Sequence, residues 1–316
     1  MAVNKEKFRP DPTTGFGSKG TEDRFYRKDG SVNVIRRGVH FLDKLSWYHT
    51  MLSMPQLRFY TVLWVVYLIV NLFFACIYYF VGIEHLGGIQ TGSPVKNFAE
   101  AFFFSAQTFT TVGYGRISPV GFLTSAIAAF EAFFGLLCFA LASGLFYGRF
   151  AKPRPYLYFS DIALITPFKV GKALMFRTVP YKNNHLTDAE VKLTLGLRIK
   201  TGNETKNEFY PLKAEFSKIN TLVLNWTIVH PITEDSPLYG LSLDQLKEVK
   251  AELLVFLKAY DEVFANTVVA RTFYTADEFI DNAKFKPMFR SSKSQNATIL
   301  NIDALNDFEL LDLKAD

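Results

Sequence analysis

Two long apolar runs dominate the pattern of hydrophobic and polar positions along the chain. Residues 60–81 carry no charged side chain, and residues 120–147 carry one, Glu131. At roughly 1.5 Å per residue, either run is long enough as a helix to cross the hydrocarbon core of a bilayer. The first run lies too far from the N-terminus, and is too long, to be a cleaved signal peptide. We therefore predict two membrane-spanning helices, at residues 57–82 and 120–149.

A shorter apolar segment lies between the two spans. Residues 97–109 have a helical, aromatic pattern that is too short to span, and they run directly into the sequence Thr110-Thr111-Val112-Gly113-Tyr114-Gly115. Helix ends and irregular backbone are tolerated at membrane depth where protein or water surrounds them. The pattern therefore predicts a re-entrant helix whose C-terminal end directs partial negative charge toward a cation.

The six residues after this helix have the chemistry of a potassium filter. A potassium ion that leaves water must exchange its hydration shell for other oxygens, which stacked rings of backbone carbonyls can supply. Successive carbonyls point at one axis only if the backbone alternates between conformations, and Gly113 and Gly115 adopt the second conformation cheaply. The Thr111 hydroxyl adds an oxygen, and Tyr114 can brace the ring from behind. Such a ring needs several chains, so the motif predicts a symmetric oligomer. The competing interpretation, a Gly-Tyr-Gly turn in a soluble loop, does not explain the flanking spans.

The second span carries residues spaced to share one helical face. Gly135, Phe139, Ser143 and Tyr147 follow an i, i+4 row. If this face lines a pore, Gly135 permits a bend, Phe139 and Ser143 line the cavity, and Tyr147 forms the innermost constriction. The alternative is that the aromatic side chains pack between helices. Glu131, the one acid in a span, is expected to support the filter from behind or to place negative charge in the cavity.

Basic residues predict how the chain crosses the membrane. Residues 1–56 contain ten Lys and Arg, whereas residues 83–120 contain only Lys96 and Arg116. By the positive-inside rule, both termini are expected in the cytoplasm and the filter segment outside, in a cell membrane. The net charge of +5 is clustered near the spans, which fits an anionic inner leaflet better than nucleic acid, for which no motif is present.

The segments that flank the spans differ in character. Residues 1–35 predict a cytoplasmic tail, and residues 36–152 a pore domain that begins with an amphipathic helix at residues 41–51. This helix is expected to lie along the inner leaflet, although the pattern alone also allows an ordinary soluble helix. After Pro153, a cytoplasmic domain is expected over residues 153–290 and a second tail over residues 291–316.

The domain after the second span has the pattern of an antiparallel, immunoglobulin-like β-sandwich. Its stretches rich in β-branched and aromatic residues lie at residues 162–165, 174–179, 191–199, 208–212, 221–229, 253–259 and 267–274. A short helix is expected at residues 241–248. No nucleotide fingerprint, metal-ligand spacing or catalytic arrangement occurs, and His230 is expected to be structural. The chain is therefore not expected to be an enzyme or to need a cofactor beyond the permeant potassium ion.

Taken together, residues 31–290 resemble the inward-rectifier potassium channels, and most closely their prokaryotic, KirBac-type branch. Beyond the filter, the supporting motifs are Met54-Pro55, Arg149-Phe150-Ala151-Lys152-Pro153, Met175-Phe176-Arg177, His230-Pro231-Ile232 and Asp261-Glu262-Val263-Phe264. The resemblance implies a homotetramer with one pore and a gate at Tyr147. It also implies potassium sites at the carbonyls of Thr111, Val112, Gly113 and Tyr114, and coupling of the amphipathic helix to the gate.

The resemblance further implies that anionic phospholipids bind at a basic stretch below the gate, here Arg149, Lys152 and Arg154. Simple positive-inside anchoring would explain the same three residues. Phe139 stands where animal members carry an acid that binds polyamines or magnesium. Weak rectification is therefore expected, unless Glu131 or acids of the cytoplasmic pore substitute.

Two further departures concern the filter surroundings and the source. Gln107 replaces a glutamate that pairs with an arginine after the filter in animal members, and Arg116 stands one residue early, so that ion pair is in doubt. Gln107 and Glu131 are nevertheless expected to support the filter. The outer loops lack the cysteines of animal channels, which indicates a prokaryotic origin. The alternatives left open are a channel gated by a soluble ligand in the β-domain and a non-conducting, membrane-tethered binding module.

Overall fold

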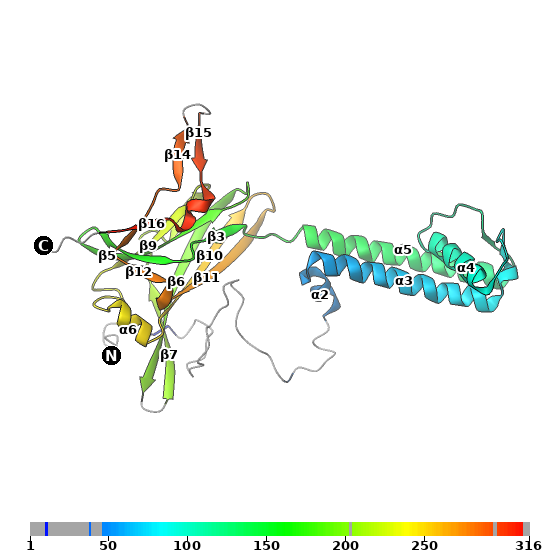
Figure 1. Cartoon of the computed structure of the whole chain (residues 1–316), viewed down its shortest axis with the longest axis horizontal. Helices are drawn as coiled ribbons and strands as arrows, with labels where there is room; N and C mark the ends of the chain where they lie inside the picture. Colours follow the sequence, from blue (N-terminus) through cyan, green and yellow to red (C-terminus); the bar gives the residue numbers. More distant parts are fainter. Residues whose placement is uncertain (1–9, 12–37, 39–45, 202–203, 293–295, 312–316) are drawn as a thin grey trace. The chain divides into compact units, whose positions relative to one another are not determined.

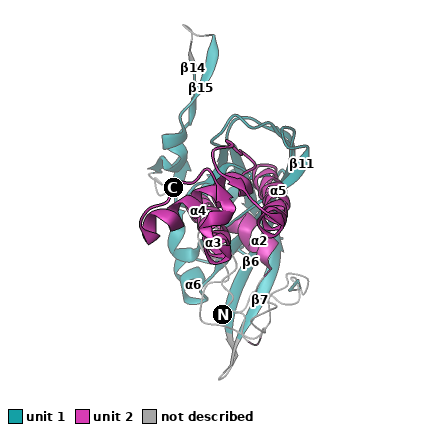
Figure 2. Cartoon of the chain, turned by 90° about the vertical axis from the view of Figure 1, so that its right-hand side faces the viewer, with its two compact units in different colours: residues 1–36, 153–316 teal, residues 37–152 magenta. Residues whose placement is uncertain are grey.

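The chain folds into two compact units. The computed structural model describes residues 10–11, 38, 46–201, 204–292 and 296–311. One unit comprises residues 37–152 and is helical, and the other comprises residues 1–36 and 153–316 and is built from β-strands (Figures 1 and 2). The boundary between the two units falls between Lys152 and Pro153.

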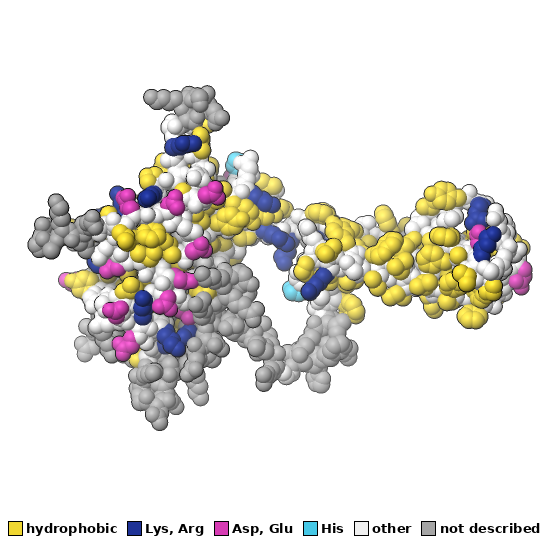
Figure 3. Space-filling model, viewed as in Figure 1, with side chains coloured by type: hydrophobic (Ala, Val, Ile, Leu, Met, Phe, Trp, Pro, Cys, Tyr) yellow, Lys and Arg dark blue, Asp and Glu magenta, His cyan; other side chains and the backbone are white. Residues whose placement is uncertain are grey.

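The helical unit contains the two predicted spans and the re-entrant helix. Its helices are α2 (Trp47–Ser53), α3 (Gln56–Val81), α4 (Pro94–Phe109) and α5 (Phe122–Phe150). Only 17% of the most apolar stretch of α3 and 11% of that of α5 is buried, so neither is the core helix of a soluble protein. Figure 3 shows apolar side chains along most of this unit, with charged side chains gathered near its two ends. These are the properties of membrane-spanning helices.

A small core holds the re-entrant helix α4 between the two spans. It joins buried residues of α3, α4 and α5 to two residues of the loops that flank α4 and the filter. Its members are Phe74, Ala75, Tyr78, Leu86, Ala101, Phe104, Ile117 and Ala128. The position of α4 is therefore set by contacts on both sides.

The predicted amphipathic helix is shorter than expected in the described residues. The pattern predicts residues 41–51, whereas α2 covers Trp47–Ser53 and residues 41–45 lie outside the described part of the chain. Pro55 follows with an extended backbone and separates α2 from α3.

The second unit is a sandwich of two five-stranded sheets. The first sheet contains β6 (Leu186–Thr201), β7 (Glu204–Leu212), β8 (Lys218–Leu222), β10 (Glu252–Asp261) and β11 (Asn266–Thr275). The second contains β3 (Leu157–Phe159), β4 (Ala163–Phe168), β5 (Gly171–Pro180), β9 (Trp226–Ile232) and β12 (Phe279–Asp281). One large apolar cluster contains inward-facing residues of both sheets, which confirms the predicted sandwich. Helix α6 (Leu243–Glu248) agrees with the predicted helix.

Two details of the sandwich differ from the expectation. The stretch at residues 221–229 is not one strand, because it contains the end of β8 and the start of β9, which belong to different sheets. Leu222 and Ile228 both reach the common core, so the apolar pattern continues across the break. In addition, β12 pairs with β4 in parallel, whereas the other strand pairs of the two sheets are antiparallel.

The expectation of a tail from residue 291 is wrong as far as Leu311. Residues beyond the sandwich form β13 (Ala283–Phe285), β14 (Phe289–Ser292), β15 (Ala297–Leu300), a 3-10 helix (Ile302–Asn306) and β16 (Phe308–Leu310). The β13 strand and the 3-10 helix of this segment pack on the outer face of the second sheet, where Leu164 contacts Ala283 and Phe285, and Val179 contacts Met288 and Leu305. The sequence of this segment is mainly polar and acidic, so its few apolar contacts could not be predicted from the pattern.

Arg177 attaches the C-terminal segment to the sandwich. Its guanidinium donates a hydrogen bond to the Lys286 carbonyl at 2.7 Å and lies 4.4 Å from the centre of the Phe285 ring. Burial lowers the pKa of Arg177 to about 10, partly offset by the negative charge of Asp307. The side chain therefore remains charged at neutral pH and anchors this segment electrostatically.

Candidate functional site

The re-entrant helix α4 is bounded by strong local signals. Ser93 caps its N-terminus by accepting a hydrogen bond from the Lys96 N–H, and Pro94 occupies the first helical position, where a missing N–H costs nothing. The helix ends at Phe109, and the candidate filter begins at the next residue. Carbonyl groups at the C-terminal end of α4 therefore lie beside the filter.

The filter backbone alternates between conformations along its length. The angle φ is +58° at Thr111, +53° at Gly113 and +78° at Gly115. Val112 and Tyr114, which lie between them, do not have a positive φ. The two glycines take the conformation that the sequence predicts for them. Thr111 does so as well, which the sequence does not predict. A β-branched residue in this region costs about 1–3 kcal/mol and persists only where its surroundings impose it.

Hydrogen bonds from the filter to the end of α4 supply part of that constraint. The Thr111 N–H donates to the Thr108 carbonyl at 3.0 Å. The N–H groups of Val112 and Gly113 both donate to the Gln107 carbonyl, at 3.0 and 3.4 Å. Gln107, predicted as a filter support, thus contributes its backbone to the inner half of the filter. The Thr110 hydroxyl donates to the Ala106 carbonyl and keeps the start of the filter close to the helix.

The side chains of the filter lie largely exposed on the single chain. Val112 is 53% exposed and Tyr114 is 80% exposed. No carbonyl ring can form from one chain, and a Tyr114 ring that braces the filter needs a neighbour to contact. Both observations agree with the expectation of an oligomer.

Gly135 of α5 lies directly against the end of α4. A Cβ atom at this position would be 2.0 Å from the Phe109 carbonyl oxygen. Because α5 is a continuous helix from Phe122 to Phe150, the glycine is required here for close packing, whereas the sequence suggested a bend. Phe139, one turn later, lines a cavity of about 530 Å³ together with Thr111 and Gly135. The structure thus brings the predicted cavity residue next to the inner end of the filter.

Glu131 forms a buried polar cluster with side chains from the other two membrane helices. Its carboxyl accepts hydrogen bonds from the Tyr78 hydroxyl at 2.6 Å and from the Ser105 hydroxyl at 2.5 Å. Ser105 also lies 3.2 Å from the Asn71 side-chain oxygen, and the Asn71 amide donates to the Tyr67 carbonyl. The cluster connects α3, α4 and α5. The sequence identifies Glu131 but gives no signal for its two partners, Ser105 and Tyr78, which lie 26 and 53 residues away.

Farther along α5, the predicted gate residue Tyr147 is exposed, and the basic residue Arg149 forms hydrogen bonds within the chain. Ser143 is exposed and Tyr147 is 77% exposed on the single chain. Arg149 donates hydrogen bonds to the carbonyls of Met51 and Met54, at the end of α2, and lies 4.5 Å from the centre of the Phe59 ring. Helix α2 is thereby attached to the last turn of α5. Lys152 and Arg154, by contrast, are exposed.

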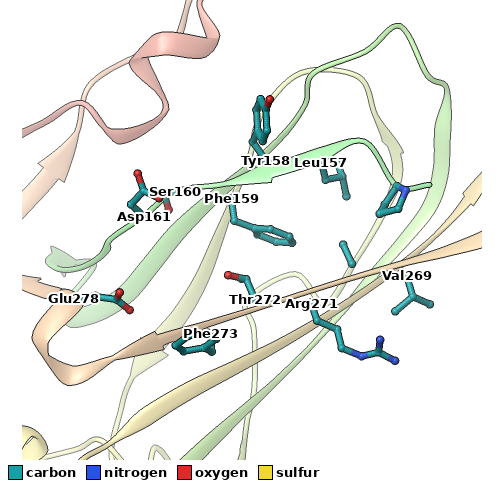
Figure 4. A pocket seen from close by; sticks show the side chains of 12 residues that line it. Leu157, Tyr158, Phe159, Ser160, Asp161, Val269, Arg271, Thr272, Phe273 and Glu278 are labelled. Carbon is teal, nitrogen blue, oxygen red and sulfur yellow. The ribbon is translucent and has the colours of Figure 1, made fainter. Parts of the chain in front are cut away.

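In the β-unit, a pocket of about 440 Å³ opens between β3 and β11. Arg271 lies at one end of this pocket, and Asp161 and Glu278 lie at the other (Figure 4). The mixture of charges favours no single class of ligand. Among the described residues, no cluster of His, Cys, Asp and Glu side chains has the arrangement of a metal site.

His230 has a structural environment, as the sequence predicts. It is buried, and its two ring nitrogens lie 2.7 Å from the Lys213 carbonyl and 2.7 Å from the Ser236 hydroxyl. Burial lowers the pKa of His230, and the hydrogen bond to Lys213 opposes that effect. A neutral histidine held at both nitrogens connects the loops that follow β7 and β9.

Comparison with known proteins assigns both units to one kind of protein. The chain matches the family model of the inward rectifier potassium channel C-terminal domain over residues 157–313 and an ion channel model over residues 65–151. It is 33% identical over 283 residues to the inward rectifier potassium channel Kirbac3.1 of Paramagnetospirillum magnetotacticum, which covers 88% of this chain and 93% of that relative.

Two animal relatives are more distant. The chain is 27% identical to the ATP-sensitive inward rectifier potassium channel 12 of Gallus gallus, over 89% of this chain and 72% of the relative. It is 28% identical to the G protein-activated inward rectifier potassium channel 4 of Mus musculus, over 87% of this chain and 70% of the relative. The two matched family models meet near residue 152, where the two structural units divide.

Proposed function

The chain belongs to the inward-rectifier potassium channel family, and on that basis we propose that it conducts potassium passively as a homotetramer with one central pore. The observation that carries this proposal is the alternation of φ at Thr111, Gly113 and Gly115. Alternating backbone conformations turn successive carbonyls toward one side of the strand. Four copies of the strand around an axis would therefore present stacked rings of oxygens to the ion.

In this mechanism, the carbonyls of Thr111, Val112, Gly113 and Tyr114 replace the hydration shell of potassium. The C-terminal end of α4 adds partial negative charge where the ion enters the filter from the cavity. Gln107 supports the inner filter by accepting two backbone N–H groups. Glu131 supports α4 from behind through Ser105 and so fixes the helix that carries the filter.

The cavity and gate follow from the exposed face of α5. Phe139 and Ser143 line the cavity, and the four copies of Tyr147 form the constriction. Both carboxyl oxygens of Glu131 are engaged by Tyr78 and Ser105, which argues against a charge that faces the cavity. With Phe139 at the position of the animal acid, rectification is weak. Phe139→Asp is expected to introduce voltage-dependent block by internal magnesium.

Both termini of the chain lie in the cytoplasm of a prokaryotic cell. Anionic phospholipids of the cytoplasmic leaflet modulate the gate. Lys152 and Arg154 are exposed and available to lipid phosphates, whereas Arg149 attaches the end of α2 to α5. Lipid bound at this basic stretch would bias the position of α2 and, through Arg149, the last turn of α5. Replacing Lys152 and Arg154 together by Gln is expected to weaken the dependence of flux on anionic lipid.

The experiment that tests this function is potassium uptake into liposomes that contain the purified protein, with sodium and barium as comparators. We expect potassium uptake that exceeds sodium uptake, is blocked by barium and is lost in Gly113→Asp. Gly240→Asp is the matched control, because Gly240 also has a positive φ and open space around it but lies in the β-unit. Equal uptake of sodium and potassium would refute the proposed selectivity.

A channel gated by a soluble ligand is the alternative that the pocket between β3 and β11 supports. Flux that depends on cytoplasmic extract at fixed lipid composition would favour this alternative. A protein that passes no ion in any lipid mixture and binds no potassium would instead favour a non-conducting, membrane-tethered module.

A further inference from the structure

The segment that follows the filter is attached to α4 by an ion pair. The Arg116 guanidinium lies 2.5 Å from the Glu100 carboxylate. Glu100 is seven residues before Gln107 on α4, which is about two helical turns toward the N-terminus of that helix. The sequence leaves an ion pair between Arg116 and position 107 in doubt. The arginine instead pairs with an acid nearer the start of the same helix.

The backbone of the same segment is held on its other side. A Cβ atom at Gly88 would be 1.9 Å from the Arg116 carbonyl oxygen, so Gly88 permits a very close approach of the two loops. Short strands β1 (Leu86–Gly87) and β2 (Ser118–Pro119) pair next to it. Ile117 is buried in the core that contains α4. Arg116 is therefore fixed through its backbone as well as its side chain.

The outer end of the filter is held differently from its inner half. Its inner half is held by hydrogen bonds to Gln107, whereas Gly115 has φ of +78° and a Cβ atom there would meet nothing within 4 Å on the single chain. A glycine without neighbours rotates easily, and rotation would turn the adjacent carbonyls away from the pore axis. Arg116 is the next residue, so whatever fixes Arg116 also limits rotation at Gly115.

The pair lies only partly in water. The Arg116 side chain is 47% exposed, but the Glu100 side chain is only 13% exposed. A carboxylate that is largely removed from water needs a charged partner, so loss of Arg116 would leave Glu100 uncompensated.

We propose that Glu100 and Arg116 are a positioning pair that braces the outer end of the filter and thereby sustains discrimination between potassium and sodium. This inference rests on the proposed potassium conduction, since it assigns to the pair a role in the same filter. Neither residue touches the ion; each acts through the backbone between Gly115 and Ile117.

The test compares the sodium-to-potassium uptake ratio in liposomes for the wild type, Glu100→Gln, Arg116→Gln and the double variant. Loss of a partly exposed ion pair should raise this ratio roughly two- to fivefold in each single variant. The double variant should be no worse than the single variants, because the interaction is already absent. Arg116→Lys, which retains the charge, should restore most of the selectivity.

Lys96→Gln is the matched control. Lys96 is the other basic residue between the spans, it is exposed, and none of the described residues forms an ion pair with it. Lys96→Gln removes one positive charge from the same segment between the spans, as Arg116→Gln does. A selectivity change in Lys96→Gln equal to that in Arg116→Gln would overturn the proposal, because it would reflect charge alone.

A second measurement does not need an open gate. Potassium should raise the thermal stability of the purified wild-type protein more than sodium does, and this difference should shrink in Glu100→Gln and Arg116→Gln but not in Lys96→Gln. Unchanged selectivity and an unchanged potassium effect in both variants would refute the brace. A wild type without any potassium preference in either assay would refute the proposed conduction itself.

Discussion

Gly135→Ala tests whether close packing of α5 on the end of α4 supports the filter. The added Cβ would be 2.0 Å from the Phe109 carbonyl oxygen, 2.9 Å from its carbon and 3.1 Å from the Phe109 Cα. Non-bonded heavy atoms are comfortable at about 3.5–4.0 Å, so the helices must separate by more than about 1 Å. Overpacking of this kind costs about 1–3 kcal/mol. Because Gln107 lies two residues before Phe109, the displacement should also disturb the carbonyl that holds the filter.

The assays are thermal unfolding of the purified protein and potassium uptake into liposomes. Gly144→Ala is the matched control, because Gly144 lies in the same helix and a Cβ there would meet nothing within 4 Å on the chain. Alanine is favoured over glycine within a helix by up to about 1 kcal/mol, so the control should be neutral or slightly stabilising. We expect Gly135→Ala to lower both stability and uptake. Equal behaviour of the two variants would refute the packing argument, and altered gating with unchanged stability would favour a hinge.

Three further predictions concern groups away from the pore axis. Tyr78→Phe removes a donor from the buried carboxyl of Glu131 and should cost about 1–3 kcal/mol of stability, whereas Tyr79→Phe should be neutral; equal thermal unfolding of the two variants would contradict this. Since burial lowers the pKa of His230, the unfolded chain binds its proton more readily, and stability should fall as the pH drops below about 6.5; pH-dependent unfolding that is identical in His230→Gln would count against this explanation. Arg177→Met should release the C-terminal segment from the second sheet and speed limited proteolysis there, and an unchanged cleavage pattern would show that apolar packing alone holds it.

The sequence by itself determined the features that depend on local rules. The length of an apolar run decides whether a helix can cross a bilayer, so both spans could be predicted within two residues at either end. The need for positive φ limits the choice to glycine in most settings, so the backbone conformation at Gly113 and Gly115 could be predicted. Alternating apolar patterns likewise predicted most strands of the sandwich and its general architecture.

Tertiary structure decided the features that depend on contacts between distant residues. Nothing local indicates that Thr111 adopts a positive φ, since part of the constraint comes from hydrogen bonds between the filter and the end of α4. The partners of Glu131 and Arg116 are Ser105 and Glu100, two polar residues of α4. The local sequence does not distinguish them from other polar residues, and only the packing of α4 in the structure brings each next to its partner. The C-terminal segment was predicted as a tail for the same reason, because its few apolar side chains become significant only when the outer face of a sheet lies beneath them.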